Sequence, residues 1–219
     1  MEKVVKVWLK YYPVYLSGLW GTLWISAVTV FLGALLGMVV ALMRMSRLKI
    51  LRTVFNVYVE ILRGTPILLQ LYFFWIGLPK LVPFELTDTQ CIVAALVVNA
   101  SAFISEIIRA GIGAVDKGQW EAALSLGVPK HRFILDVILP QAIKNTFPAL
   151  INESIALLKD SSLVSVIGVA DTLRWADLIQ AKTFRAFEAF IVAAAVYYVL
   201  VMILTFIGAY FEKKVRISD

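Results

Sequence analysis

The chain has 219 residues, of which 61% are hydrophobic and only 16% are charged, and its mean hydropathy is +0.85. This composition excludes an ordinary soluble domain and indicates a protein surrounded mostly by lipid. A net charge of +6 would suit nucleic acid, but basic residues in so apolar a chain are expected to flank membrane spans, so we expect no nucleic-acid partner. The single cysteine, Cys91, excludes an intrachain disulfide framework.

Long apolar runs follow one another along the whole chain. A spanning helix needs about 20 mainly apolar residues. The chain begins with an amphipathic, aromatic segment that has no cleavage-site pattern, so we expect this segment to be retained and to lie at the membrane interface. The runs of sufficient length are Leu16–Met43, Leu51–Ile76, Thr89–Ala114, Phe133–Leu158 and Phe187–Phe211. We therefore predict an all-α fold, a polytopic bundle of five transmembrane helices that forms one domain over residues 1–219.

Positive residues gather in three of the segments that flank these runs, and such residues mark the cytoplasmic side of a membrane. They are Arg44, Arg47, Lys49 and Arg52 after the first run, Lys117, Lys130 and Arg132 after the third, and Lys213, Lys214 and Arg216 at the end. The connections Gly77–Asp88 and Lys159–Glu188 are expected outside, although Arg174, Lys182 and Arg185 weigh against the second. The N-terminus is then outside and the C-terminus cytoplasmic.

The first run contains a GxxxG pattern, Gly33 to Gly37, that allows another helix to approach closely. The approaching helix could belong to the same chain or to a second subunit, and the sequence leaves both open.

A short charged helix is predicted in the cytoplasmic segment of residues 116–131. Asp116 can cap it, Glu121 adds negative charge near its start, and Gly127 followed by Pro129 ends it after about three turns. We expect Trp120 and Leu124 to form one apolar edge, with the small Ala122 and Ala123 allowing close contact. Such a helix exceeds what a linker needs, which favours docking to a partner over packing on its own bundle.

Several motifs resemble those of a known family. Glu121-Ala122-Ala123, Gly127 and Val137-x-Leu139-Pro140 resemble the EAA motif of permease subunits of ABC-type importers, with Val137 in place of the usual isoleucine. Residues 60–70, 99–111 and 158–168 are similar to the polar amino-acid branch, which serves histidine, glutamate, glutamine, arginine and opines. The resemblance covers nearly the whole chain and implies the type I importer permease fold.

The resemblance also implies a function and partners. The EAA helix would be the coupling helix, with Glu121, Ala122, Ala123 and Gly127 contacting an ATPase subunit. An assembly in the bacterial inner membrane would contain two identical or homologous permeases, two ATPases and an extracytoplasmic amino-acid-binding protein, and would work by alternating access. The chain lacks the G-x-x-x-x-G-K-[ST] phosphate loop, so we expect no catalytic residue here, with ATP and Mg²⁺ bound by the partner ATPase.

Polar groups at membrane depth are costly unless they are paired or face water, so they indicate a transport pathway. Three clusters of this kind occur: Glu60, Arg63 and Gln70; Asn99, Ser101, Ser105, Glu106 and Arg109; and Asn145, Asn152, Glu153 and Asp160. From them we select five candidates for the substrate pathway: Arg63, Gln70, Asn99, Glu153 and Asp160.

Structural interpretations of the same residues stay open. Glu60 and Arg63 are spaced for an ion pair on one helix face, and so are Glu106 and Arg109. Asn99 suits an interhelical hydrogen bond as well as cargo contact. Gly64 and Pro66 weaken the helix after Arg63 and could free backbone carbonyls toward a cavity. Asp160 could simply end its helix at the outer membrane edge.

Two other function classes fit these features less well. An ion-gradient-driven secondary transporter or channel subunit is the alternative, but it gives the EAA segment no purpose, and the chain shows no inverted repeat. An intramembrane enzyme is excluded because no Ser–His or metal-ligand set lies within a span. His131, the only histidine, lies beside Lys130 and Arg132, so no metal site is expected. The cargo stays undetermined, with two acidic residues favouring a cationic amino acid slightly.

Overall fold

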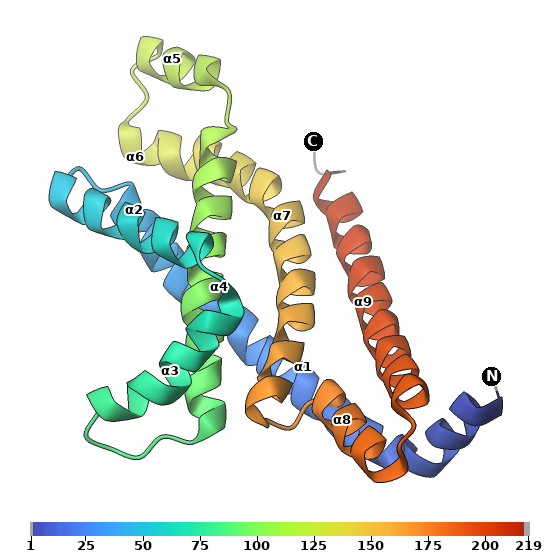
Figure 1. Ribbon diagram of the computed structural model, residues 1–219. Helices are drawn as coiled ribbons and strands as arrows, with labels where there is room; N and C mark the ends of the chain where they lie inside the picture. The colour runs from blue at the N-terminus through green and yellow to red at the C-terminus, as the bar shows by residue number, and fades with distance from the viewer. Residues whose placement is uncertain (1, 217–219) are drawn as a thin grey trace.

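The computed structural model describes residues 2–216, and every regular element in this part of the chain is a helix, without a strand (Figure 1). The α-helices are α1 (Glu2–Arg44), α2 (Lys49–Gly64), α3 (Ile67–Leu81), α4 (Asp88–Gly113), α5 (Lys117–Ser125), α6 (Lys130–Arg132), α7 (Leu139–Asp160), α8 (Thr172–Thr183) and α9 (Ala186–Arg216). The π-helix η1 (Phe133–Ile138) precedes α7, and the 3₁₀-helix η2 (Ser161–Ile167) follows it. The all-α prediction is confirmed.

Within the described residues, four helices are long and apolar enough to cross a membrane, and a bent pair brings the number to five if it counts as one span. The bent pair is α2 with α3, whose axes differ by 110°. The prediction of a continuous span from Leu51 to Ile76 is therefore wrong in shape. The cause is local: Pro66 has no backbone N–H, and it forces Thr65 before it into an extended conformation, so the helix stops and restarts.

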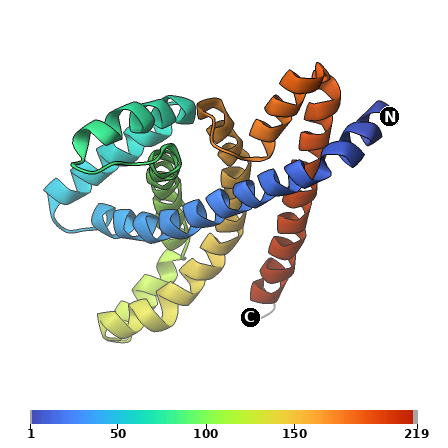
Figure 2. The same cartoon turned by 90° about the horizontal axis from the view of Figure 1, so that it is seen from below.

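Helix α1 is longer than predicted because the N-terminal segment continues directly into the span, with Pro13 inside the helix. Figure 2 shows that α1 crosses the other helices along its length, and it contacts α8 and α9 in its first part and α4 and α2 further on. Val7 and Tyr15 are buried in a cluster with α8 and α9, and the Tyr15 hydroxyl donates to the Ala189 carbonyl at 2.8 Å. The start of the chain is thus part of the bundle.

Helix α4 is the centre of the bundle. In the most apolar 18-residue stretch of α4, 56% is buried inside the bundle. The corresponding value is 17% for each of the spans that contain α7 and α9. Gly33 and Gly37 of α1 face α4, where added Cβ atoms would lie 2.8 Å from Ala100 and 2.9 Å from Ile104. The GxxxG pattern therefore serves packing within the chain, which decides between the two alternatives that the sequence left open.

A buried polar cluster fastens the start of α8 to α1 and α9. The Thr22 hydroxyl lies 3.0 Å from that of Thr172 and accepts from the Thr172 backbone N–H. The Asp171 carboxylate caps α8 by accepting from the Arg174 N–H at 2.7 Å, and it accepts from the Tyr197 hydroxyl at 2.7 Å. Burial raises the pKa of the Asp171 carboxyl, while these two hydrogen bonds act in the opposite direction.

The contact between α1 and the segment before α8 gives a stability prediction. A Cβ at Gly21 would lie 2.3 Å from the Ala170 carbonyl oxygen, which is backbone and cannot rotate away. Gly21→Ala is therefore expected to destabilise the protein by about 3 kcal/mol, as in overpacked cores. Gly77→Ala is the matched control, because nothing lies within 4 Å of its Cβ position in α3. Thermal unfolding in detergent measures both, and equal midpoints would contradict this packing.

The fourth span differs from a plain helix at its start. Residues 133–138 form a π turn directly before Pro140, which has no N–H and whose ring clashes with the carbonyl four residues earlier. A second proline, Pro148, lies inside α7. Figure 1 shows α6 and α7 running in different directions, so the chain bends in the segment around Pro140.

Candidate functional site

A cavity of about 370 Å³ opens between α2, α4 and α7. Its polar lining residues are Arg63 from α2, Glu106 from α4, and Asn145 and Glu153 from α7. Along α4 the lining runs from Phe103, near the middle of the helix, to Ala114 just beyond its end, which is the end that carries α5. The volume lies in the range of small-molecule sites.

Two opposite charges line this cavity without an ion-pair partner among the described residues. The Arg63 guanidinium lies over the Phe103 ring, 5.5 Å from its centroid. It forms no ion pair within residues 2–216, and the half-buried Glu153 carboxylate forms neither an ion pair nor a hydrogen bond there. The pair predicted between Glu60 and Arg63 is wrong: Glu60 is exposed, and the Arg63 side chain turns to α4 instead. Neither cavity charge is neutralised by an ion pair at 4.0 Å or less within the described chain.

Gln70 and Asn99 lie beside the bend between α2 and α3 and are buried rather than lining the cavity. The Gln70 amide donates to the carbonyls of Leu62 and Thr65 at 2.8 and 3.2 Å, and its oxygen accepts from Asn99 at 2.9 Å. The carbonyls that Pro66 leaves without a helical donor are thus satisfied by a side chain, not exposed to a cavity as expected. These two residues hold the bend, and through it the position of Arg63.

Asp160 is the last residue of α7, half-buried, and does not line the cavity. The η2 turn that follows packs back into the bundle, where Ser161 accepts a hydrogen bond from Ser26 at 3.2 Å. The connection after α7 is therefore partly internal.

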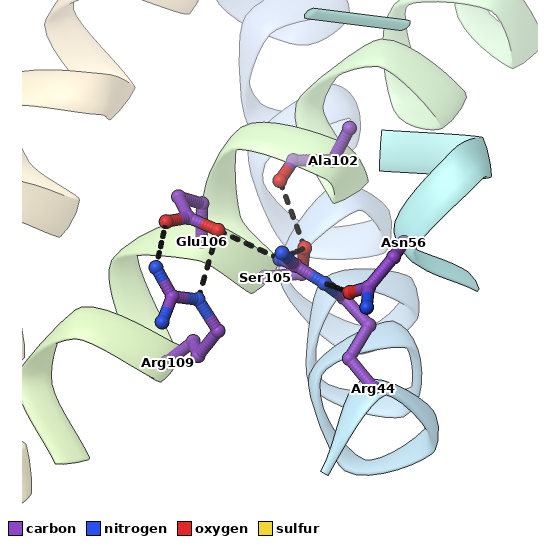
Figure 3. A network of polar contacts seen from close by, with 6 residues as sticks. All are labelled: Arg44, Asn56, Ala102, Ser105, Glu106 and Arg109. Atoms are coloured by element: carbon purple, nitrogen blue, oxygen red, sulfur yellow. Dashed lines mark hydrogen bonds and ion pairs between the residues drawn. The ribbon is translucent and has the colours of Figure 1, made fainter. Parts of the chain in front are cut away.

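A polar network closes one side of the cavity and joins three helices (Figure 3). Arg44 of α1 donates to Glu106 of α4 at 2.8 Å and to Asn56 of α2 at 2.9 Å. Arg109 donates to both oxygens of Glu106, and Arg44 also reaches Ser105 at 3.3 Å. The Glu106–Arg109 pair is as predicted. Arg44 and Asn56 were missed, because Arg44 counts in the sequence only as one of several basic residues after a span.

The two arginines of this network are expected to differ in their contribution to stability. The Arg44 side chain is 10% exposed and bonds to α2 and α4, whereas the Arg109 side chain is 50% exposed and bonds within its own helix. Arg44→Ala should lower the free energy of unfolding by about 2–3 kcal/mol, the cost of losing bonds to a charged group. Arg109→Ala should cost less than about 1 kcal/mol, as for exposed pairs. Detergent thermal melts of both variants check this, and the reverse order would refute it.

The predicted helix of residues 116–131 forms as α5 and projects beyond the bundle (Figure 1). Asp116 caps it by accepting from the Gly118 N–H at 2.7 Å. Gly127 adopts a left-handed φ of +65° just after the helix, and the next residue, Val128, donates its N–H back to the Ala123 carbonyl at 3.0 Å. The predicted capping by Asp116 and termination at Gly127 are therefore confirmed. Glycine suits the position after the helix because it adopts a left-handed φ without strain.

The two faces of α5 differ sharply. Glu121, Ala122 and Gly127 are exposed, as are Leu124 at 80% and Leu126 at 79%, while Ala123 is buried at 9%. The expected apolar edge of Trp120 with Leu124 is wrong. Trp120 packs edge-on against Phe133 of η1, with ring centroids 4.9 Å apart. One face thus holds α5 on its own chain, and the other presents two leucines without a partner in the described chain.

Helix α7 carries polar side chains on a face that the described chain leaves uncovered. Asn145 and Asn152 are exposed and Glu153 is half-buried, although the helix has the length of a span. Amide and carboxylate groups at this depth are costly against lipid. This face therefore requires water or another polypeptide beside it.

Comparison with known proteins gives consistent matches. Residues 33–217 match the family described as "Binding-protein-dependent transport system inner membrane component". The arginine transport system permease protein ArtQ of Bacillus subtilis (strain 168) is 45% identical over 207 residues, 94% of either chain. A putative glutamine transport system permease protein GlnP of Rickettsia typhi is 38% identical over 98% of this chain and all of that one. The crystal structure of an amino acid ABC transporter with histidines is 46% identical, with a TM-score of 0.89 over 94% of this chain and 96% of that one.

Proposed function

Since the chain belongs to the family of binding-protein-dependent transport system inner membrane components, we propose that it forms the pathway of an ATP-driven importer of polar amino acids. The all-α fold of a type I importer permease supports this. The observation that carries the proposal is the cavity in which Arg63 and Glu153 present opposite charges without partners. A free amino acid carries a carboxylate and an ammonium group, and the two cavity charges complement them.

The proposed cargo is a cationic amino acid, arginine first. Glu153 and Glu106 line the cavity, but Glu106 is neutralised by Arg44 and Arg109, which leaves Glu153 as its free anion. Asp160, at the end of α7, is a further carboxylate, but it lies outside this cavity. The relative with 45% identity is named for arginine transport, whereas the putative glutamine permeases of Rickettsia species are 38–42% identical. Glutamine is the second candidate on that ground.

Coupling to a partner ATPase is assigned to α5. Glu121, Ala122 and Gly127 lie on its exposed side together with Leu124 and Leu126. Ala123 has a different proposed role from Glu121 and Ala122, because it packs α5 against its own chain. Through this contact, a movement of α5 would be transmitted to η1 and α7. ATP and Mg²⁺ belong to the partner in this assignment, and the present chain supplies only the docking surface.

A second permease, identical or homologous, is proposed to cover the polar face of α7. Two such faces across a water-filled space would satisfy Asn145, Asn152 and Glu153 without exposing them to lipid. The extracytoplasmic amino-acid-binding protein would then approach from the end opposite α5. This orientation puts the N-terminus outside and the C-terminus in the cytoplasm.

The same geometry supports the proposal of alternating access. The cavity lies in the half of the bundle nearer α5. In the other half an apolar cluster that includes Ile25, Leu71 and Ile92 fills the space between α1, α3 and α4. We assign this arrangement to the state open toward the ATPase. Closure of the ATPase dimer on ATP would move α5 and open the opposite half.

The test is purification of the complex in mild detergent, followed by ATPase assays with single amino acids. Co-purification of an ATPase that arginine stimulates, through a binding protein where one is present, supports the proposal. Stimulation by glutamine alone would correct the cargo. A subunit without any ATPase, whose transport follows an ion gradient, would replace this function with the secondary-transporter alternative.

A further inference from the structure

The corner between α8 and α9 has an unusual backbone. Phe184 adopts a left-handed φ of +55°, and among residues 2–216 it is the only non-glycine residue with positive φ. Its N–H closes α8 by donating to the Gln180 carbonyl at 2.8 Å. Glycine or asparagine normally fills such a position, because a larger side chain is strained there. The Phe184 ring is hardly packed against its own chain, since the residue is 93% exposed, so burial of the ring does not offset the strain.

Cationic and aromatic side chains surround this residue. Lys182 and Arg185 are exposed and form no ion pair within the described chain. Phe187, in the first turn of α9, is 73% exposed. The sequence Lys-Thr-Phe-Arg-Ala-Phe thus alternates free cations with free rings over six residues.

The corner lies where a spanning helix leaves the membrane. Helix α9 starts at Ala186 and has a mean hydropathy of 2.6 in its most apolar window. Figure 1 shows the corner at the end of the bundle opposite α5, on the same side as the connection between α3 and α4. In the proposed orientation this end faces outside, where the positive-inside rule disfavours basic residues, so Lys182 and Arg185 are unusual there.

We propose that Lys182, Phe184, Arg185 and Phe187, the corner site, bind the phosphate of an anionic phospholipid headgroup. The cations contact the phosphate, and the rings lie at the boundary between headgroups and acyl chains, where aromatic side chains are favoured. A phospholipid fits better than an acidic protein because the exposed apolar surface continues along α9 through Phe190 and Ile191 into the bilayer. The inference goes beyond the proposed function, and only the placement of the corner site on the outer side of the membrane rests on the orientation proposed above.

The test places a fluorophore next to the corner site without altering it. Ala186 is exposed, so Ala186→Cys in a Cys91→Ala background gives one labelling position in the chain. In nanodiscs holding the whole transporter, quenching by spin-labelled phosphatidylglycerol is compared with quenching by spin-labelled phosphatidylcholine. The ratio of the two association constants should favour phosphatidylglycerol, and Lys182→Gln with Arg185→Gln should reduce it about fivefold for each charge removed.

The matched control is Lys213→Gln with Lys214→Gln, which removes two exposed charges at the other end of α9 and should leave the ratio unchanged. Phe184→Asn keeps a residue that tolerates left-handed φ and should weaken quenching by both lipids. Inorganic phosphate in excess should not compete. Equal quenching by the two lipids in the unmodified site, competition by free phosphate, or protection of the fluorophore only when the binding protein is added would each overturn the proposal.

Discussion

Glu153→Gln is expected to reduce uptake of the cationic amino acid by about a hundredfold. The substitution keeps the shape of the side chain and removes the one anion of the cavity that no arginine neutralises. Losing a charged hydrogen-bond partner in a partly buried site costs about 3 kcal/mol, which corresponds to that factor. Because Glu153 bonds to nothing within residues 2–216, the folded subunit should not lose stability. Transport into proteoliposomes at several substrate concentrations measures the effect.

Glu60→Gln is the matched control for this prediction. It makes the same chemical change on α2, three residues from Arg63, but the Glu60 side chain is exposed and does not line the cavity. Uptake should stay at the unmodified level. Arg63→Met should lower transport as Glu153→Gln does, since it removes the charge facing the carboxylate of the cargo. Full transport by Glu153→Gln, or equal loss in the Glu60 control, would remove the cavity from the pathway.

The resemblance and the hydropathy pattern together predicted the fold class, the family and the four long spans, while the fifth predicted span is the bent pair of α2 and α3. They did so because long apolar runs have few structural alternatives in lipid. Gly64 and Pro66 indicated where the helix breaks, but the sequence did not predict the angle of 110° between α2 and α3. A proline shows where a helix stops, but the direction in which the chain continues depends on contacts such as the bond between Gln70 and Asn99.

The candidate site was predicted in part. Arg63 and Glu153 were selected because charges at membrane depth are costly, and the structure brings both to one cavity. Gln70 and Asn99 were selected for the same reason, but they bond to each other and do not line the cavity. A hydrogen bond between two helices also removes the cost of placing a polar side chain at membrane depth. Sequence spacing likewise suggested the Glu60–Arg63 pair, but Arg63 had an aromatic ring of α4 as a competing partner. Only tertiary contacts decide between such alternatives.

Gly127→Asn is expected to uncouple ATP hydrolysis from uptake, lowering transport about tenfold or more while leaving membrane insertion intact. Asparagine tolerates the left-handed φ of +65° that this position requires, so α5 should still form. A Cβ atom added at this position meets nothing within 4 Å in this chain, so we expect a loss of coupling to come from a partner surface that closes over Gly127. Substrate-stimulated ATPase activity and uptake are measured on the same preparation.

Two further variants separate contact from backbone strain. Gly77→Asn adds the same side chain at another open glycine, in α3 and away from α5, and should transport normally. Gly127→Val adds a β-branched residue that does not tolerate positive φ, with a strain of about 1–2 kcal/mol in the turn after α5. If contact decides, Gly127→Asn and Gly127→Val are both uncoupled. If Gly127→Val alone is uncoupled, the glycine serves only to end α5, and the docking surface must be limited to Glu121, Ala122 and the exposed leucines.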